Sequence, residues 1–296
     1  MTTAIEEMQV PDPKKASEWS RWRLAKRYNI RMYIASGIIA AYVLLAIFGP
    51  MITRFSPLDV NITGTLVPPL RRVPGHGTAV LGTDALGRDI LAEVISGARI
   101  SLVIGFVTVS IALIWGAVAG VIAGYVSGWA DSVIMRLVDV QLAFPSVILA
   151  ILIAGALGAS AVNVIVALTL ASWVVFARIA RGITLATRSQ PYVEASRLLG
   201  ANTWHIMRRA ILPSCSSSLV IFATVQLGFV IVAEAALSFL GVGIPPSQAS
   251  WGSTIADGRE YLQTAWWIST VPGLALAILV VCISTVGDEL TSRRQG

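Results

Sequence analysis

The sequence predicts an all-α integral membrane protein with six transmembrane helices, as its composition and its apolar stretches both indicate. Of the 296 residues, 55% are hydrophobic and only 13% are charged, whereas a soluble domain carries about 25% charged residues. The mean hydropathy of +0.75 agrees with a chain whose surface faces lipid. A window of about 19 residues, long enough to cross a bilayer, finds the spans. They are Tyr33–Thr53, Ser101–Val126, Ser132–Ala154, Val162–Ala180, Ser217–Leu240 and Ala265–Val286.

Basic residues indicate which side of the membrane each part of the chain occupies. They gather before the first span, between the fourth and fifth spans, and in the tail. Because cytoplasmic segments carry an excess of Lys and Arg, all three places are predicted to be cytoplasmic. The residues are Lys14, Lys15, Arg21, Arg23, Lys26, Arg27 and Arg31, then Arg181, Arg188, Arg197, Arg208 and Arg209, then Arg293 and Arg294. The pI of about 9.7 therefore reports orientation, and nucleic acid is not an expected partner because no basic stripe or recognition motif is present.

The spans divide the chain into five parts. These are a basic cytoplasmic segment, the first transmembrane helix, an external segment, a five-helix core with a cytoplasmic loop at 181–213, and a cytoplasmic tail. Their bounds are 1–31, 32–53, 54–98, 99–290 and 291–296. For the first part, a membrane-interfacial helix and a solvated segment both remain open. In the external segment, Asp84 is a suitable N-cap for an amphipathic helix whose apolar side holds Ile90, Leu91, Val94 and Ile95.

The second span carries a glycine at every fourth position: Gly116, Gly120 and Gly124. Residues at this spacing share one face of a helix, and small residues there let two membrane helices approach closely. We therefore expect a packing interface along this face. The pattern does not indicate which helix is the partner.

Four charged residues lie in or beside predicted spans, where charge is costly unless it is paired or faces water. Asp131 and Asp139 flank Arg136 close to the end of a span, and a local ion pair among them is expected. Glu234 lies in the fifth span, toward its external end. It can line a substrate route or brace helix packing, and we favour packing because its neighbours in the sequence are small.

Several kinds of chemistry are missing from the sequence. There is no Gly-x-x-x-x-Gly-Lys-Ser/Thr phosphate loop, so the chain is not expected to bind ATP by itself. His76 and His205 are predicted to lie on opposite sides of the membrane, and Cys215 and Cys282 are interpreted as apolar packing residues. No metal site, catalytic group or cofactor is therefore expected in this chain, and a membrane enzyme is poorly supported.

The polar segment Glu194–Pro213 interrupts two apolar spans and is longer than a simple turn requires. Gly200 permits a sharp change of direction within it, and Pro213 is expected to end it and to begin the fifth span. It displays the apolar side chains of Leu198, Leu199, Trp204, Ile206 and Met207. From the residues alone, a helical docking surface for a cytoplasmic partner and a loop that rests on lipid headgroups are equally favoured.

Three motifs resemble one family of membrane proteins. Glu194-Ala195-Ser196, then Gly200, then Leu212-Pro213 resembles the EAA loop of ABC importer permeases, although Ser196 replaces the second Ala and Ala210 stands where an Ile is common. Two further stretches resemble the dipeptide/oligopeptide/nickel branch. They are Leu81–Asp84 with Gly87–Asp89 and Gly97–Leu102, and Glu234–Gly241 with Pro245-Pro246 and Ser250–Gly252. The likeness covers most of residues 80–290 and is to the second, C-type permease of a pair.

The resemblance implies a type I ABC importer permease fold in the bacterial inner (plasma) membrane, with both termini cytoplasmic. It implies a subunit of an ATP-driven, binding-protein-dependent importer of di- or oligopeptides. The implied partners are a second permease subunit, two ATP-binding domains, an external substrate-binding protein and membrane lipid. ATP and Mg would be bound by the ATPase partners, so this chain is a transport subunit and not an enzyme.

The family's functional residues carry over to the polar segment. By the resemblance, this segment forms the coupling helix that docks on an ATPase subunit and transmits its movement. The residues implied in coupling are Glu194, Ala195, Ser196, Gly200, Ala201, Leu212 and Pro213. An ABC permease for nickel or another small solute remains an alternative. A secondary transporter acting alone is a weaker one, because no clearly broken helix or mid-span acid is found.

Overall fold

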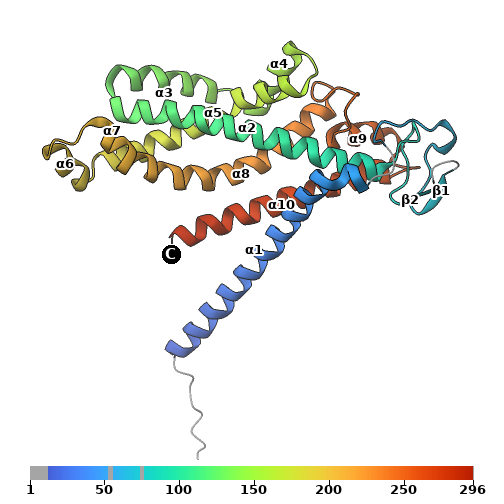
Figure 1. Cartoon of the computed structure of the whole chain (residues 1–296), viewed down its shortest axis with the longest axis horizontal. Coiled ribbons are helices and arrows are strands. Elements are labelled where there is room, and N and C mark those ends of the chain that lie inside the picture. The colour runs from blue at the N-terminus through green and yellow to red at the C-terminus, as the bar shows by residue number, and fades with distance from the viewer. Residues whose placement is uncertain (1–12, 53–55, 74–76, 296) are drawn as a thin grey trace, which may run out of the picture.

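The computed structural model describes residues 13–52, 56–73 and 77–295. Among these residues, five helices are long and apolar enough to cross a membrane. They are α1 (Pro13–Ile52), α2 (Ile90–Val126), α5 (Ala161–Arg188), α8 (Leu212–Phe239) and α10 (Trp267–Gln295). Helices α2, α5 and α8 run alongside one another, whereas the amino-terminal half of α1 projects away from the rest (Figure 1).

The third expected span, Ser132–Ala154, is a bent pair of helices and not a straight one. It consists of α3 (Gly128–Leu142) and α4 (Ser146–Leu157), which meet at 89°. Pro145 explains the bend, because it lacks an N–H and disfavours helical geometry at the residue before it. Its ψ of 124° is extended. A sixth crossing therefore exists only if this pair counts as one span.

The glycine face of α2 packs against α5, which identifies the partner helix and confirms the expected interface. The three positions are Gly116, Gly120 and Gly124. A Cβ added at any of them would lie less than 3.0 Å from a backbone oxygen of α5, namely that of Trp173, Ala177 or Arg181. Any side chain larger than hydrogen would therefore force the two helices apart.

Four apolar clusters lie between the described helices, and the two largest join the long ones. The main core lies between α2, α5 and α8 and includes Phe176, which is fully buried. The second joins α2, α8 and α10 to the short helix α9 (Trp251–Gly258), which is followed by the 3-10 turn η3 (Arg259–Tyr261). Trp251 is fully buried there, and its indole N–H donates to the backbone oxygen of Val94 at 2.9 Å.

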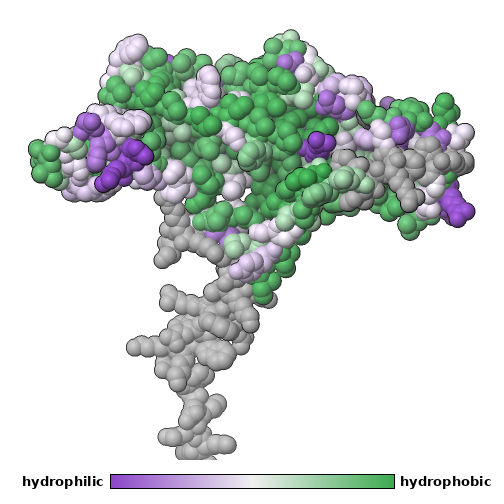
Figure 2. All heavy atoms as spheres, in the orientation of Figure 1, coloured by the Kyte–Doolittle hydropathy of each residue, from purple (hydrophilic) through white to green (hydrophobic). Residues whose placement is uncertain are grey.

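The segment between α1 and α2 is mostly irregular, and it lies at the end of the molecule beside α9 (Figure 1). It contains the 3-10 turn η1 (Ile62–Gly64) and an antiparallel pair of short strands, β1 (Arg71–Val73) and β2 (Gly77–Ala79). We call this part of the molecule the hairpin end. Figure 2 shows hydrophilic residues at the hairpin end and at the opposite end, where α6 and α7 lie, with a largely apolar surface between them.

The expected N-cap at Asp84 is wrong, although the helix that carries Ile90, Leu91, Val94 and Ile95 does lead into the second span. Asp89 is the N-cap instead, and its side chain accepts from the Leu91 N–H, so Ile90 begins α2 itself. The chain cannot run helically from Asp84, because Gly87 has φ +73°. Asp84 accepts from the backbone N–H groups of Leu86 and Arg88 in the turn before α2.

Candidate functional site

The connection between α5 and α8 (residues 189–211) forms the end of the molecule opposite the hairpin end (Figure 1). It begins with α6 (Pro191–Leu198), whose first residue is a proline that needs no hydrogen-bond partner there. The helix stops at Gly200, which has φ +84°. The Gly200 N–H donates to Arg197 and the Ala201 N–H to Ser196, both at 3.0 Å, which is a Schellman cap. Gly200 therefore produces the sharp turn that the sequence indicated.

After the turn, the chain becomes helical again and continues into α8. Asn202 caps α7 (Thr203–Ile206) by accepting from the His205 N–H at 2.8 Å. A π-helical turn, η2 (Met207–Ile211), then leads into α8 without a break. Pro213 lies in the first turn of α8, which confirms that it begins the fifth span. The expected break there is wrong, because the change of direction lies at Gly200. The wider π turn before Pro213 accommodates the hydrogen bond that a proline cannot make.

The α5–α8 connection presents apolar side chains both inward and outward. Val193, Ile206 and Ile211 are at most 3% exposed and anchor the connection on the main core. Four others point away from the protein: Leu198 is 86% exposed, Leu199 89%, Trp204 68% and Tyr192 54%. Burying one such side chain is worth about 1.5–3 kcal/mol. An exposed group of them marks a surface that another molecule or lipid covers.

The residues implied in coupling occupy different positions on the connection. Glu194 and Ala195 are exposed on α6, and Ser196 is half-buried, its hydroxyl donating to the Tyr192 oxygen at 2.8 Å. Ala201 is half-buried and packs against the main core just after the turn. The remaining two, Leu212 and Pro213, are exposed at the start of α8.

Glu234 lies in a different part of the molecule and is fully buried. Its Oε2 accepts from the Ser101 hydroxyl of α2 at 2.7 Å, and its Oε1 accepts from Ser238 at 2.9 Å. Ser238 in turn accepts from the Ile244 N–H at 3.2 Å. The carboxylate thus joins α2, α8 and the loop after α8, which favours the packing role over a place in a substrate route.

The expected ion pair within Asp131, Arg136 and Asp139 is wrong, because both carboxylates pair with α5. Arg181 donates to the two oxygens of Asp131 through Nε and Nη2, and Arg178 Nη2 pairs with Asp139. The pairs therefore fasten α3 to the side of α5. Sequence spacing indicated Arg136 because spacing relates only residues that are close in the chain. The actual partners of the two aspartates are 50 and 39 residues away.

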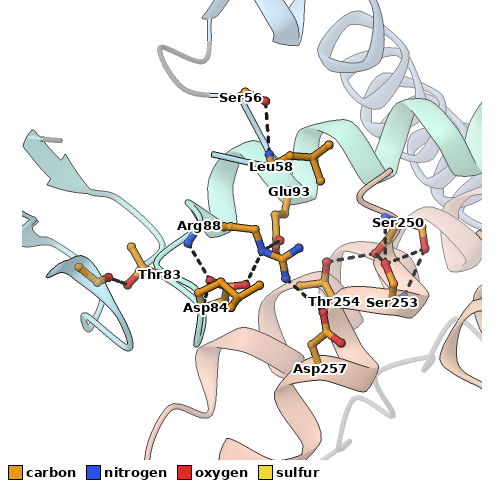
Figure 3. Close-up of polar contacts among 12 residues, drawn as sticks. Ser56, Leu58, Thr83, Asp84, Arg88, Glu93, Ser250, Ser253, Thr254 and Asp257 are labelled. Carbon is orange, nitrogen blue, oxygen red and sulfur yellow. Dashed lines mark hydrogen bonds and ion pairs between the residues drawn. The ribbon is translucent and has the colours of Figure 1, made fainter. Parts of the chain in front are cut away.

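A buried charged group at the hairpin end was not found from the sequence. We call Asp84, Arg88, Glu93 and Asp257 the Arg88 cluster (Figure 3). The Arg88 Nε lies 2.6 Å from Asp84 and 3.1 Å from Glu93, and its Nη2 lies 3.1 Å from Asp257. Burial opposes the charge of Arg88, but the carboxylates outweigh it and raise its pKa above the usual value. One residue thus ties the α1–α2 segment to both α2 and α9.

Within the described residues, no group of three or more His, Cys, Asp or Glu side chains could hold a metal ion. The Arg88 cluster borders a cavity of about 500 Å³, which is also lined by Arg259, Glu260 and Tyr261. The negative charges of the acidic side chains around the cavity are balanced by Arg88 and Arg259. The Arg88 cluster therefore serves to join the α1–α2 segment, α2 and α9. A signal for it existed in the sequence, since Arg88 and Glu93 stand next to a strongly apolar stretch.

Comparison with known proteins assigns the family. Residues 116–293 match the family described as the binding-protein-dependent transport system inner membrane component. The chain is 38% identical over 248 residues to the di/tripeptide transport system permease protein DppC of Pseudomonas aeruginosa, covering 84% of this chain and 82% of that one. It is 40% identical over 210 residues to the glutathione transport system permease protein GsiD of Pectobacterium atrosepticum, covering 71% and 70%.

A solved structure confirms the expected fold. A chain of the inward-facing MetNI methionine ABC transporter superposes with a TM-score of 0.55 at 22% identity, covering 66% of this chain and 93% of that one. The shared fold is the type I fold of ABC transporter permeases. The chain therefore belongs to the family of binding-protein-dependent transport system inner membrane components, which are multi-pass permease subunits of ABC transporters.

Proposed function

We propose that this chain is the transmembrane permease subunit of an ATP-driven importer of peptides in the bacterial inner membrane. The observation that carries the proposal is the α5–α8 connection. In a chain of this family, it displays Leu198, Leu199 and Trp204 at a polar end of an otherwise apolar molecule. A helix held on the core by one face and exposing apolar side chains on the other is suited to a groove on a partner.

The partner on this surface is an ATP-binding subunit, and the end that carries it is cytoplasmic. The basic residues of the connection support this orientation, with Arg197, Arg208 and Arg209 all exposed there. Both termini are placed on the same side by the same rule. ATP and Mg are bound by two ATPase domains, and this chain contributes no catalytic group.

The implied coupling residues divide the work along the connection. Glu194, Ala195 and Ser196 lie on the docking helix α6, and Gly200 sets the direction of the chain that leaves it. Ala201 seats this turn on the main core. Leu212 and Pro213 begin α8, so movement of the connection reaches a long transmembrane helix without an intervening loop.

The translocation route requires a second permease subunit, and an external binding protein delivers the cargo. Peptides are the cargo class we propose, because one relative is named for di- and tripeptides and another, in Alkalihalophilus pseudofirmus, for dipeptides at 35% identity. The relative named for glutathione is as similar. Peptide length therefore needs an uptake measurement with defined peptides.

Copurification tests the docking surface. Leu198→Asp places a charge on the exposed face of α6, whereas Leu70→Asp makes the same change at the hairpin end, where Leu70 is 75% exposed. We expect Leu198→Asp to lower both ATPase copurification and peptide uptake at least tenfold, and Leu70→Asp to leave copurification normal. Normal copurification of the ATPase with the Leu198→Asp chain would overturn the proposal.

A further inference from the structure

The corner between α2 and α3 (residues 124–128) has an unusual backbone. Ser127 has φ 60° and ψ −167°, a region that is almost exclusive to glycine. Gly128, which follows, also has positive φ, at +61°. A non-glycine residue remains in such a conformation only where its surroundings hold it there. The backbone of the α2–α3 corner is therefore strained at Ser127, and contacts with other parts of the protein hold it in this conformation.

Arg188, the last residue of α5, holds the α2–α3 corner through hydrogen bonds. Its Nη1 lies 3.2 Å from the oxygen of Gly124, 2.8 Å from that of Tyr125 and 2.6 Å from the hydroxyl of Ser127. The last carbonyls of a helix have no partner within the helix, and a cation there also matches the helix dipole. Arg188 thus caps α2 and holds the strained serine with one nitrogen.

The docking helix touches the same corner. The guanidinium of Arg197, on α6, lies over the ring of Tyr125 at 5.6 Å from its centroid, within cation–π range. Two arginines that frame the start of the connection therefore converge on one corner. Apart from these arginines, α6 is held to the transmembrane helices by Val193, which is buried in the main core, and by the ends of α5 and α8.

We propose that Arg188 is a positioning residue that ties the α5–α8 connection to the α2–α3 corner. Through this tie, movement of α6 reaches α2 and the bent pair α3–α4 as well as α5 and α8. The inference rests on the proposed coupling function and extends it to residues outside the implied coupling motif. Loss of Arg188 should leave the fold intact, because the glycine face of α2 and the Arg181–Asp131 pair hold α2, α3 and α5 together.

The decisive readout is the number of peptides transported per ATP hydrolysed by the whole reconstituted importer with its binding protein. We expect Arg188→Ala to assemble normally, to keep hydrolysing ATP and to lower this ratio at least fivefold. Arg188→Lys, which keeps the charge, should recover part of it. The matched control is Arg178→Ala on the same helix, since Arg178 is 58% exposed and pairs with Asp139 away from the corner. This control should keep the normal ratio.

A normal ratio in the Arg188→Ala importer overturns the proposal. If that variant does not assemble, Arg188→Gln, which keeps most of the side-chain length, replaces it, and a normal ratio there has the same meaning. Leu198→Asp separates the two claims. Should Arg188→Ala couple normally while Leu198→Asp loses the ATPase, only the tie is wrong; should Leu198→Asp also be normal, the proposed function fails with it.

Discussion

The two polar ends of this permease are built in opposite ways. The hairpin end is largely irregular in its backbone, yet Arg88 joins it to α2 and α9 through two buried carboxylates, Asp84 and Glu93, and an exposed one, Asp257. The α5–α8 connection is mostly helical, yet it leaves Leu198 and Leu199 almost fully exposed. Regular secondary structure is thus no guide to how firmly a segment is held. The two ends differ in where their side chains find partners. The charged groups around Arg88 pair with one another within the chain, whereas the exposed apolar side chains of the α5–α8 connection are left for another molecule to cover.

Removing Arg88 should have the largest effect on stability. Asp84 is 2% exposed and Glu93 is 1% exposed, so Arg88→Met leaves two buried acidic side chains without their basic partner, which costs about 3–5 kcal/mol. We expect a large fall in Tm in detergent. The double variant Arg88→Met/Glu93→Gln should recover part of it, because residue 93 then carries no charge and Asp84 keeps the two backbone N–H groups that donate to it. Arg259→Met, at an exposed arginine nearby, is the control. An Arg88→Met protein with an unchanged Tm would show that the hairpin end is not held by this cluster.

Glu234 tests whether a buried carboxylate in the membrane region braces packing. Glu234→Val deprives the Ser101 and Ser238 hydroxyls of their acceptor, which costs about 1–3 kcal/mol. Glu234→Gln, which still offers an acceptor oxygen, should cost less. Thermal unfolding measures both. Full stability combined with lost peptide uptake would instead place Glu234 in the substrate route.

Gly200→Val should have a smaller effect on stability and a large one on transport. A β-branched residue at φ +84° costs about 1–2 kcal/mol, and the turn after α6 should change direction. We expect normal membrane insertion with strongly reduced peptide uptake. Gly182→Val is the control, since an added Cβ at Gly182 meets nothing within 4 Å and its φ is ordinary. Wild-type uptake by the Gly200→Val importer would remove the turn from the coupling route.

Leu198→Asp should have the smallest effect on stability, within about 0.5 kcal/mol, because the side chain makes little contact within the chain. The same variant is expected to lose its ATPase partner. Arg88→Met should therefore lower the stability of the chain, whereas Leu198→Asp should prevent assembly with the ATPase subunits. A large fall in the Tm of the isolated Leu198→Asp chain would mean that α6 supports the fold itself.

Local features of the fold could be predicted from the sequence, whereas long-range pairings could not. The spacing of Gly116, Gly120 and Gly124 indicated a packing face, but periodicity along one helix carries no information about its partner. The bend at Pro145 was missed because a hydropathy window averages apolar character and ignores backbone geometry. Arg88 and Asp257 are 169 residues apart, and no spacing rule joins them.

For the candidate site, the sequence indicated the segment and its turn, but not its connections. Gly200 was expected to turn the chain because glycine alone favours positive φ, and it does so. The continuous helix through Pro213 was not expected, since a π turn depends on packing that sequence does not reveal. The hydrogen bond between Arg188 and Ser127 could not be predicted either. An arginine at the end of a span is already explained by the rule that cytoplasmic segments are basic, so Arg188 did not stand out.

The most direct test of the central claim is protection of a single cysteine on α6. Leu198→Cys places a thiol on the exposed face, while the native Cys215 and Cys282 are 2% and 7% exposed and should react slowly. In inside-out vesicles, a membrane-impermeant maleimide should label Leu198→Cys when the ATPase subunits have been stripped away, and should fail to do so in the assembled importer. Equal labelling with and without the ATPase subunits would contradict the account.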